Sequence, residues 1–222
     1  MSAEPRPSAT VVVVRDATSQ LEVLLLERNT GKSIWVFPGG KVDAGDGLAP
    51  GQPDWEGPAR RAAAREAREE AGLSLDPAAL VPISRWVTPA LSPQRFDTLF
   101  FAVGVGPDVA VRVDGGEISG HRWFAPGAAL AAMREGEIRL APPTFVTVSW
   151  LAGHASAAAA LGALARTPLV TFHPRICSVE GGACILYPGD AGYEAGDPAR
   201  PGPRHRLLTS GGEGFQYERS GC

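Results

Sequence analysis

Runs of apolar residues separated by short polar turns fill the N-terminal part of the chain. Residues 9–15 and 21–27 are rich in valine and leucine, and residues 16–20 between them are typical of a turn. This pattern predicts a hairpin of two buried strands, followed by a short strand over 34–37. Residues 1–8 are polar and contain two prolines, so we expect a frayed arm there.

The pattern changes from strand-like to helix-like between Asp54 and Gly72. Alanines recur through this stretch and favour a helix that packs closely against a sheet. Pro58 suits the first turn, where its missing N–H costs little, and we expect the helix to start between Asp54 and Ala59. Gly72 suits the left-handed position after the last turn, so the helix is expected to end there.

Three carboxylates share one face of this predicted helix, because they stand at positions i, i+3 and i+4: Glu66, Glu69 and Glu70. Like charges at these spacings destabilise an isolated helix by about 0.2–0.5 kcal/mol per pair. Arg65 and Arg68 can offset the repulsion on a solvated face crossed by salt bridges. A divalent cation offsets it better, because hard oxygen ligands beside a backbone turn suit magnesium or manganese.

The remainder of the chain alternates between strand-like and helix-like stretches. Further strands are expected over 80–87, 99–105 and 117–124, and helices over 126–134, 145–151, with Thr144 as N-cap, and 156–166. From residue 167 onward, prolines and glycines separate short β-branched runs. We therefore predict one domain over 1–166 and a C-terminal extension over 167–222 that packs on it as a β-hairpin.

His205 lies between two arginines in this extension. Such a cluster fits either contact with a phosphate or a neighbouring subunit, or a basic surface on an edge strand that blocks aggregation. Both interpretations place His205 near the surface of the protein.

Composition narrows the class of protein. The chain has 222 residues, 44% of them hydrophobic, which is enough for one domain with an appendage. Its net charge of −3 provides no basic field for nucleic acid or an anionic membrane. No apolar run reaches the length of a membrane span or of a signal peptide core. The chain has three cysteines, and this odd number favours free thiols over disulfides. A cytoplasmic location is the expectation.

One motif connects the glycine turn with the acidic helix. It resembles the Nudix box, G-x5-E-x7-R-E-U-x-E-E-x-G-U, through Gly40, Arg65, Glu66, Glu69, Glu70, Gly72 and Leu73. Asp46 stands at the position of the first glutamate, and eighteen residues instead of seven separate it from Arg65. An insertion over roughly 47–57, rich in Gly, Pro and Asp, therefore splits the box and is expected to be a surface loop.

A split box of this kind is similar to the branch of the Nudix hydrolase superfamily that contains the peroxisomal coenzyme A diphosphatases and their bacterial relatives. The stretches WVTP at 86–89 and RFDTLFF at 95–101 are similar to the same branch. The resemblance implies an α+β fold, an α/β/α sandwich with a mixed central sheet. It also implies an enzyme that hydrolyses a nucleoside diphosphate derivative with Mg²⁺ or Mn²⁺.

The substrate implied by this branch is coenzyme A or an acyl-coenzyme A. Two alternatives stay open at this point. One keeps the chemistry and changes the substrate to ADP-ribose, NADH or a nucleotide sugar. The other is a nucleotide-sensing module without catalysis, for which Asp46 and the insertion are the support. A homodimer is expected as well, because a hairpin tail leaves free strand edges.

The resemblance also assigns roles to residues. It implies metal ligation by the Gly40 carbonyl with Glu66, Glu69 and Glu70, and catalytic roles for Arg65, Glu66, Glu69 and Glu117. Arg65 would orient a glutamate of the box through a charge-assisted hydrogen bond. Glu117 is expected to complete the metal site or act as base, or else to be a solvent-exposed carboxylate.

Two basic residues are candidates for contact with substrate phosphate. Lys41 follows the glycine turn, and a solvated side chain is the alternative. Arg95 can bind a phosphate in a bidentate manner, and an ion pair with Asp97 is the alternative.

Overall fold

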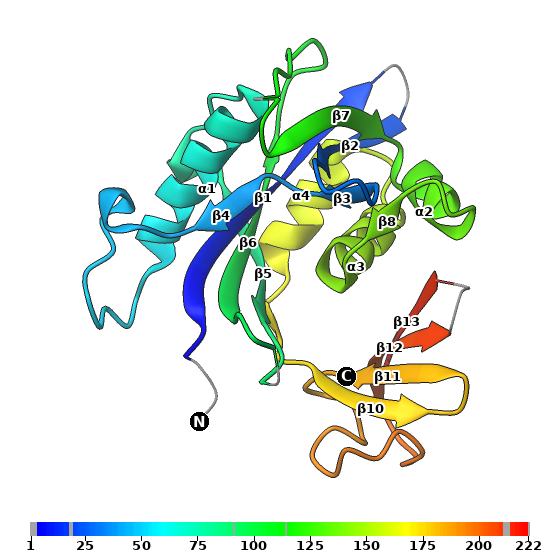
Figure 1. Ribbon diagram of the computed structural model, residues 1–222. Coiled ribbons are helices and arrows are strands. Elements are labelled where there is room, and N and C mark those ends of the chain that lie inside the picture. Colours follow the sequence, from blue (N-terminus) through cyan, green and yellow to red (C-terminus); the bar gives the residue numbers. More distant parts are fainter. Residues whose placement is uncertain (1–3, 18–19, 91, 114, 211–213, 222) are drawn as a thin grey trace.

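The chain folds into a sheet covered by helices on both faces, with a second, smaller sheet below it (Figure 1). Figure 1 is a computed structural model, and it describes residues 4–17, 20–90, 92–113, 115–210 and 214–221. None of the helices in these ranges is both long enough and apolar enough to cross a membrane.

The central sheet contains nine strands within the described ranges and is mixed in direction. The strand order is β8-β3-β2-β1-β6-β5-β9, while β4 also pairs with β1 and β7 with β2. β1 and β6 run parallel, whereas β1 and β2 run antiparallel. The bounds are β1 Arg6–Ala17, β2 Gln20–Arg28, β3 Ile34–Val36, β4 Gly39–Lys41, β5 Val81–Val87, β6 Phe96–Gly104, β7 Ile118–Phe124, β8 Arg139–Leu140 and β9 Val170–Phe172.

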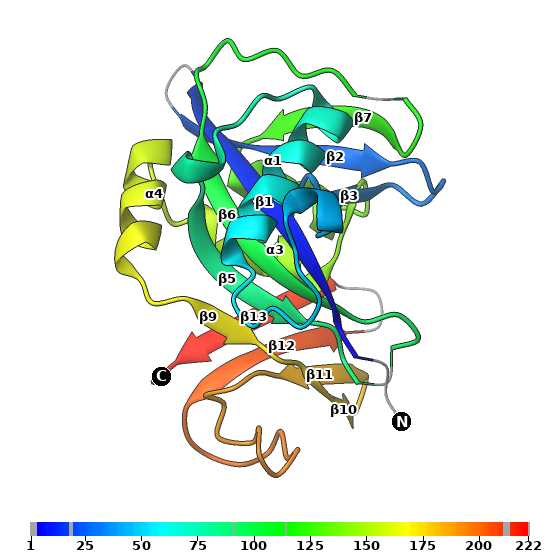
Figure 2. The same ribbon diagram turned by 90° about the vertical axis from the view of Figure 1, so that its left-hand side faces the viewer.

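Alternation along β1 explains why the sheet is covered on both faces. Val11 and Val13 belong to the core under α1, while Val12 and Val14 belong to the core on the opposite face. α1 (Glu56–Ala71) therefore lies on one side, and α2 (Pro126–Arg134), α3 (Pro142–Leu151) and α4 (Ala157–Arg166) lie on the other (Figures 1 and 2). Short 3-10 turns, η1 (Ala44–Asp46) and η2 (Pro77–Ala79), flank α1 in the sequence. The expected α/β/α layers are present.

The C-terminal extension is larger than a hairpin. It forms a four-stranded antiparallel sheet of β10 (Arg175–Val179), β11 (Gly182–Leu186), β12 (Arg204–Ser210) and β13 (Gly214–Ser220). Tyr187 and Leu207 from this sheet are fully buried in the core that contains α3 and α4. β9, which follows residue 166, pairs with β5 and so belongs to the central sheet. The division of the chain into 1–166 and 167–222 stays a prediction.

Two local expectations were wrong. Within residues 1–8, the part from Arg6 onward is strand, because Arg6 pairs with Phe96 of β6 and its N–H donates to the Arg95 carbonyl at 3.0 Å. α3 begins at Pro142 after Ala141, so Thr144 is a buried residue inside the helix and not its N-cap. Two prolines in the first turn account for the earlier start, since their missing N–H groups are not needed there.

His205 was expected near the surface, and this was also wrong. Its side chain is 2% exposed and packs among the rings of Phe172, Tyr187 and Tyr217. The neighbouring Arg206 is buried too, because its guanidinium donates two hydrogen bonds of 2.8 and 2.7 Å to the fully buried Asp190. The predicted basic cluster is thus divided by alternation along β12, with His205 on the face toward the core.

Candidate active site

The glycine turn holds the backbone close to both β1 and α1. Gly39 and Gly40 pair with Thr10 and Ala9 of β1. A Cβ atom at Gly39 would lie 2.5 Å from the Ala9 carbonyl oxygen. At Gly40 it would overlap Glu66 Oε1 and lie 2.8 Å from Oε2. The absence of a side chain at Gly40 therefore leaves the space that the Glu66 carboxylate occupies.

The acids of α1 lie near this turn because the alanines of the same helix pack into the core and fix how the helix is rotated. The stripe that packs on the sheet is made of fully buried alanines: Ala59, Ala62, Ala63, Ala67 and Ala71. Glu66 and Glu70 flank this stripe and are half-buried. Glu70 Oε2 accepts a hydrogen bond of 2.9 Å from the Gly39 N–H. Two of the three predicted acids thus converge on the glycine turn.

Arg65 connects the remaining parts of the box. Its Nη1 donates to Glu66 Oε1 at 2.8 Å and to Glu69 Oε2 at 2.9 Å, and its Nη2 donates to the Lys41 carbonyl at 3.0 Å. These contacts fix the orientation of two carboxylates and the end of β4 together. They are the kind of contact that the orienting role proposed for Arg65 requires.

Asp46 is the partner that holds Arg65 in place. Its two carboxylate oxygens accept from Arg65 Nε and Nη2, each at 3.1 Å, and its side chain is 5% exposed. Burial alone would raise the pKa of Asp46, but the hydrogen bonds from Arg65 keep that pKa below its ordinary value. Sequence reasoning noticed Asp46 only as a departure from the box pattern. Its position at the first acid of the box was the signal that pointed to it.

The acids at the turn differ in their protonation behaviour. Burial raises the pKa of Glu70 to about 7, and the charges of Glu66 and Glu117 add to this effect. Burial also raises the pKa of Glu66, although its hydrogen bond with Arg65 opposes the shift. Glu70 is therefore a carboxyl group that can take up or release a proton near neutral pH.

Glu117 lies in the same neighbourhood. It directly precedes β7 and forms an ion pair with Arg28 at the end of β2. The negative charge of Glu117 contributes to the raised pKa of Glu70, so the two carboxylates lie close enough to repel each other. Its side chain is more than half exposed and open to solvent. The sequence did not reveal the role of Arg28, because Arg28 and Glu117 come together only through the pairing of β2 with β7.

The two basic candidates lie at one end of the sheet. Ser8 of β1 pairs with Lys41 on one side and with Thr98 of β6 on the other. Lys41 is exposed, and Arg95 immediately precedes β6, where its Nε donates to the Thr88 carbonyl at 3.3 Å. The alternative partner of Arg95, Asp97, accepts from Arg85 Nε at 2.7 Å.

The donor set at the turn fits a hard divalent cation in its chemistry. It consists of carboxylate oxygens next to a peptide carbonyl, and Gly40 leaves space for Glu66 beside that carbonyl. Arg65 engages one oxygen each of Glu66 and Glu69, and no residue in the described ranges donates to the other oxygen. Over the same ranges, no three His, Cys, Asp or Glu side chains already converge as a metal-binding group. Glu66 and Glu69 are thus held by Arg65, while Glu70 is held by the Gly39 N–H.

Comparison with known proteins agrees with this geometry. The family model of the NUDIX domain matches residues 4–143. The acyl-coenzyme A diphosphatase NUDT19 of Xenopus laevis is 30% identical over 139 residues, which is 60% of this chain and 36% of that protein. The chain thus matches about a third of the length of this relative.

Solved structures show the same fold. A NUDIX hydrolase from Alicyclobacillus acidocaldarius superposes with a TM-score of 0.65 at 24% identity, covering 75% of this chain and 99% of the other. The NUDIX domain of Shewanella oneidensis NrtR, solved with ADP ribose, has a TM-score of 0.50 at 15% identity and covers 66% of this chain and 86% of the other.

Proposed function

Because the chain belongs to the NUDIX family, we propose that it is a metal-dependent diphosphatase that cleaves the diphosphate of a nucleoside derivative. The observation that carries this proposal is the convergence of Glu66 and Glu70 of α1 on the turn at Gly39 and Gly40. Glu66 and Glu70 are half-buried beside this turn, and burial raises the pKa of both. A bound cation would offset the cost of desolvating two neighbouring carboxylates.

The residues that would hold the cation are Glu66, Glu69, Glu70 and the Gly40 carbonyl. When bound, Mg²⁺ or Mn²⁺ supplies charge neutralisation at the phosphate oxygens and acidifies a water molecule. Arg65 would fix the orientation of Glu66 and Glu69 through its hydrogen bonds, and Asp46 would hold Arg65 in place. The preorganisation of these side chains is the contribution of the protein.

Hydrolysis joins the oxygen of water to one phosphorus atom and breaks the bond to the bridging oxygen. The proton of the water must pass to a base. Glu117, which is exposed close to Glu70 and is not among the residues that would hold the cation, is the carboxylate suited to accept it. Lys41 and Arg95 lie at the same end of the sheet and would contact the phosphates of the substrate.

Coenzyme A or an acyl-coenzyme A is the proposed substrate. The split box supports this choice, and so does the 30% identity to a protein named as an acyl-coenzyme A diphosphatase. A homodimer and a cytoplasmic location stay predictions.

The test is a panel of coenzyme A, an acyl-coenzyme A, ADP-ribose, NADH and a nucleotide sugar, each incubated with Mg²⁺ and with Mn²⁺. Coenzyme A must yield adenosine 3',5'-bisphosphate and phosphopantetheine, whereas ADP-ribose must yield AMP. The proposed substrate class requires the highest kcat/KM for a coenzyme A derivative. Cleavage of ADP-ribose alone would contradict coenzyme A or an acyl-coenzyme A as the substrate but would support the diphosphatase activity. Tight binding without any product would overturn the activity itself.

A further inference from the structure

A large cavity lies on the face of the central sheet opposite α1. Its volume is about 550 Å³, within the range of cavities that bind small ligands. β5 and β9 supply its floor, α3 and α4 one wall, and β13 of the C-terminal sheet the other. Glu66, Glu69 and Glu70 lie on α1, on the other face of the sheet, so the cavity is separate from the proposed active site.

The walls of this cavity are mostly apolar. Ile83, Val146, Leu164 and Val170 provide aliphatic surface. Several of its aromatic rings are already engaged with other rings. Trp86 stacks on Phe172 with 3.8 Å between the ring centroids, and Phe145 meets Phe215 edge-on at 5.4 Å. A flexible aliphatic chain therefore suits the cavity better than a planar ligand that needs a free ring face for stacking.

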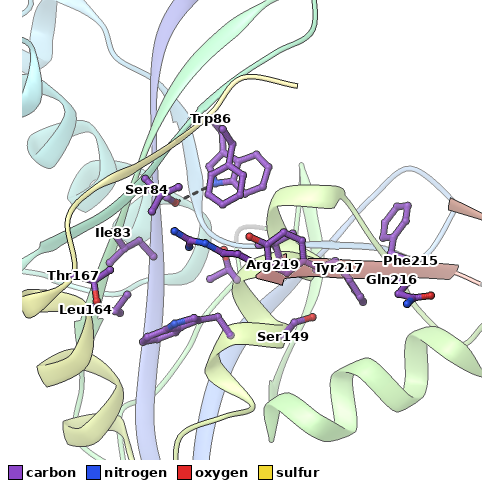
Figure 3. Close-up of a pocket in the computed structure, with 16 residues that line it drawn as sticks. Ile83, Ser84, Trp86, Ser149, Leu164, Thr167, Phe215, Gln216, Tyr217 and Arg219 are labelled. Carbon is purple, nitrogen blue, oxygen red and sulfur yellow. Dashed lines mark hydrogen bonds between the residues drawn. The ribbon is translucent and has the colours of Figure 1, made fainter. Parts of the chain in front are cut away.

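Arg219 adds one positive charge to this apolar surface. It stands on β13 at every second position after Phe215 and Tyr217, and these three side chains share the face toward the core. Its side chain extends from β13 toward Ser84 and Ile83 (Figure 3). Within the described ranges no acid forms an ion pair with Arg219, and its side chain makes no hydrogen bond. Arg219 is exposed, so its guanidinium lies where the cavity meets solvent.

We propose that this cavity binds a single-chain amphiphile that carries a carboxylate. The aliphatic chain would lie against Ile83, Leu164 and Val170, and the carboxylate would pair with the guanidinium of Arg219. Burial of each methylene group contributes about 0.8 kcal/mol, and the fork of an arginine matches a carboxylate in geometry. The ligand class follows from the apolar walls together with Arg219, the one Lys or Arg among the described residues that line the cavity. This site is independent of the proposed hydrolysis.

The direct test is titration of the full chain with dodecanoate, followed by calorimetry and by the fluorescence of Trp86 and Trp150 beside the cavity. Dodecanol and dodecyltrimethylammonium serve as neutral and cationic analogues, all below their micelle-forming concentrations. We expect saturable binding with one site, in the order dodecanoate, dodecanol, dodecyltrimethylammonium. Absence of saturable binding by dodecanoate would overturn the proposal, and so would equal affinity for all three compounds.

Two variants locate the ligand. Arg219→Gln is expected to weaken dodecanoate about tenfold and to leave dodecanol unchanged, because only the carboxylate uses the guanidinium. Arg166→Gln is the matched control, since Arg166 is exposed on α4 but does not line the cavity. Leu164→Trp fills the cavity and is expected to abolish binding of both compounds, with circular dichroism to verify the fold. Equal effects of Arg219→Gln and Arg166→Gln, or unchanged binding in Leu164→Trp, would exclude this cavity as the site.

Discussion

Asp46 and Arg65 form a partly buried ion pair with two hydrogen bonds, although they are nineteen positions apart in the chain. The insertion that splits the Nudix box lies between them, and it leaves this pair intact. Arg65 in turn reaches Glu66, Glu69 and the Lys41 carbonyl. The acid at the first position of the box thus holds the arginine that contacts Glu66 and Glu69, which agrees with the positioning role proposed for it.

Asp46→Asn tests this positioning. The amide keeps the shape of the carboxyl group but loses its charge and turns a donor toward the guanidinium. We expect the free energy of unfolding to fall by about 1–3 kcal/mol and kcat to drop together with it, because a buried charged partner is lost. Urea unfolding and steady-state kinetics measure the two effects. Asp108→Asn, in an exposed loop, is the control, and equal behaviour of the two variants would contradict the role.

Gly40→Ala tests the space that the glycine leaves for Glu66. The added Cβ would overlap the carboxylate, so we expect Glu66 to be displaced and kcat/KM to fall about a hundredfold. Gly45→Ala is the matched control, because a Cβ there meets no atom within 4 Å. Normal activity in Gly40→Ala would show that the position of Glu66 beside the turn is unimportant.

Glu70→Gln separates catalysis from stability. Glutamine can still accept from the Gly39 N–H, so the fold is expected to persist while turnover falls by about 10²–10⁴-fold. Since the pKa of Glu70 is raised to about 7, the folded protein binds more protons than the unfolded chain between about pH 4.5 and 7. Stability of the wild type should therefore decline as pH rises through this window.

The pH dependence of stability also provides a control measurement for Glu70→Gln, because glutamine does not titrate. In chelator, the stability of Glu70→Gln should exceed that of the wild type at pH 8 and approach it at about pH 3.5, where Glu70 is protonated in both folded and unfolded chains. Urea midpoints at the two pH values decide this. A constant difference between the two proteins would contradict a raised pKa at Glu70.

His205 provides a second pH dependence, of opposite sign. Burial lowers its pKa, and Arg219 adds to this, while its hydrogen bond with the Pro188 carbonyl opposes it. The unfolded chain then binds more protons below about pH 6.5, so stability is lost as pH falls, by at most about 1.4 kcal/mol per pH unit. In the described ranges, Nε2 of His205 is a buried atom without a partner. The imidazole is therefore held neutral among the rings around it.

His205→Phe should remove this loss of stability below pH 6.5, because phenylalanine fits among the same rings and does not titrate. His121→Phe, on the exposed part of β7, should retain it. Urea unfolding between pH 5 and 8 compares the two. The same acid destabilisation in both variants would assign it to titrating groups other than His205.

Local pattern was enough for much of the chain. The apolar runs in residues 9–15 and 21–27 predicted β1 and β2, and the recurring alanines with Pro58 and Gly72 predicted α1. The fold class and the family followed from the glycine turn and the acids on one helical face. These features are readable because helical and strand periods act over a few residues, so that neighbours in sequence are neighbours in space.

Contacts between distant segments were decided only in the tertiary structure. Periodicity does not reveal that Asp46 reaches Arg65 across an insertion, or that Arg28 meets Glu117. The burial that raises the pKa of Glu70 and encloses His205 depends on which surfaces pack against each other. The sequence by itself thus determined the chemistry available to this protein, while the packing of its sheets decided the partner and the charge state of each group. The physical reason is that burial and long-range pairing are properties of the assembled fold.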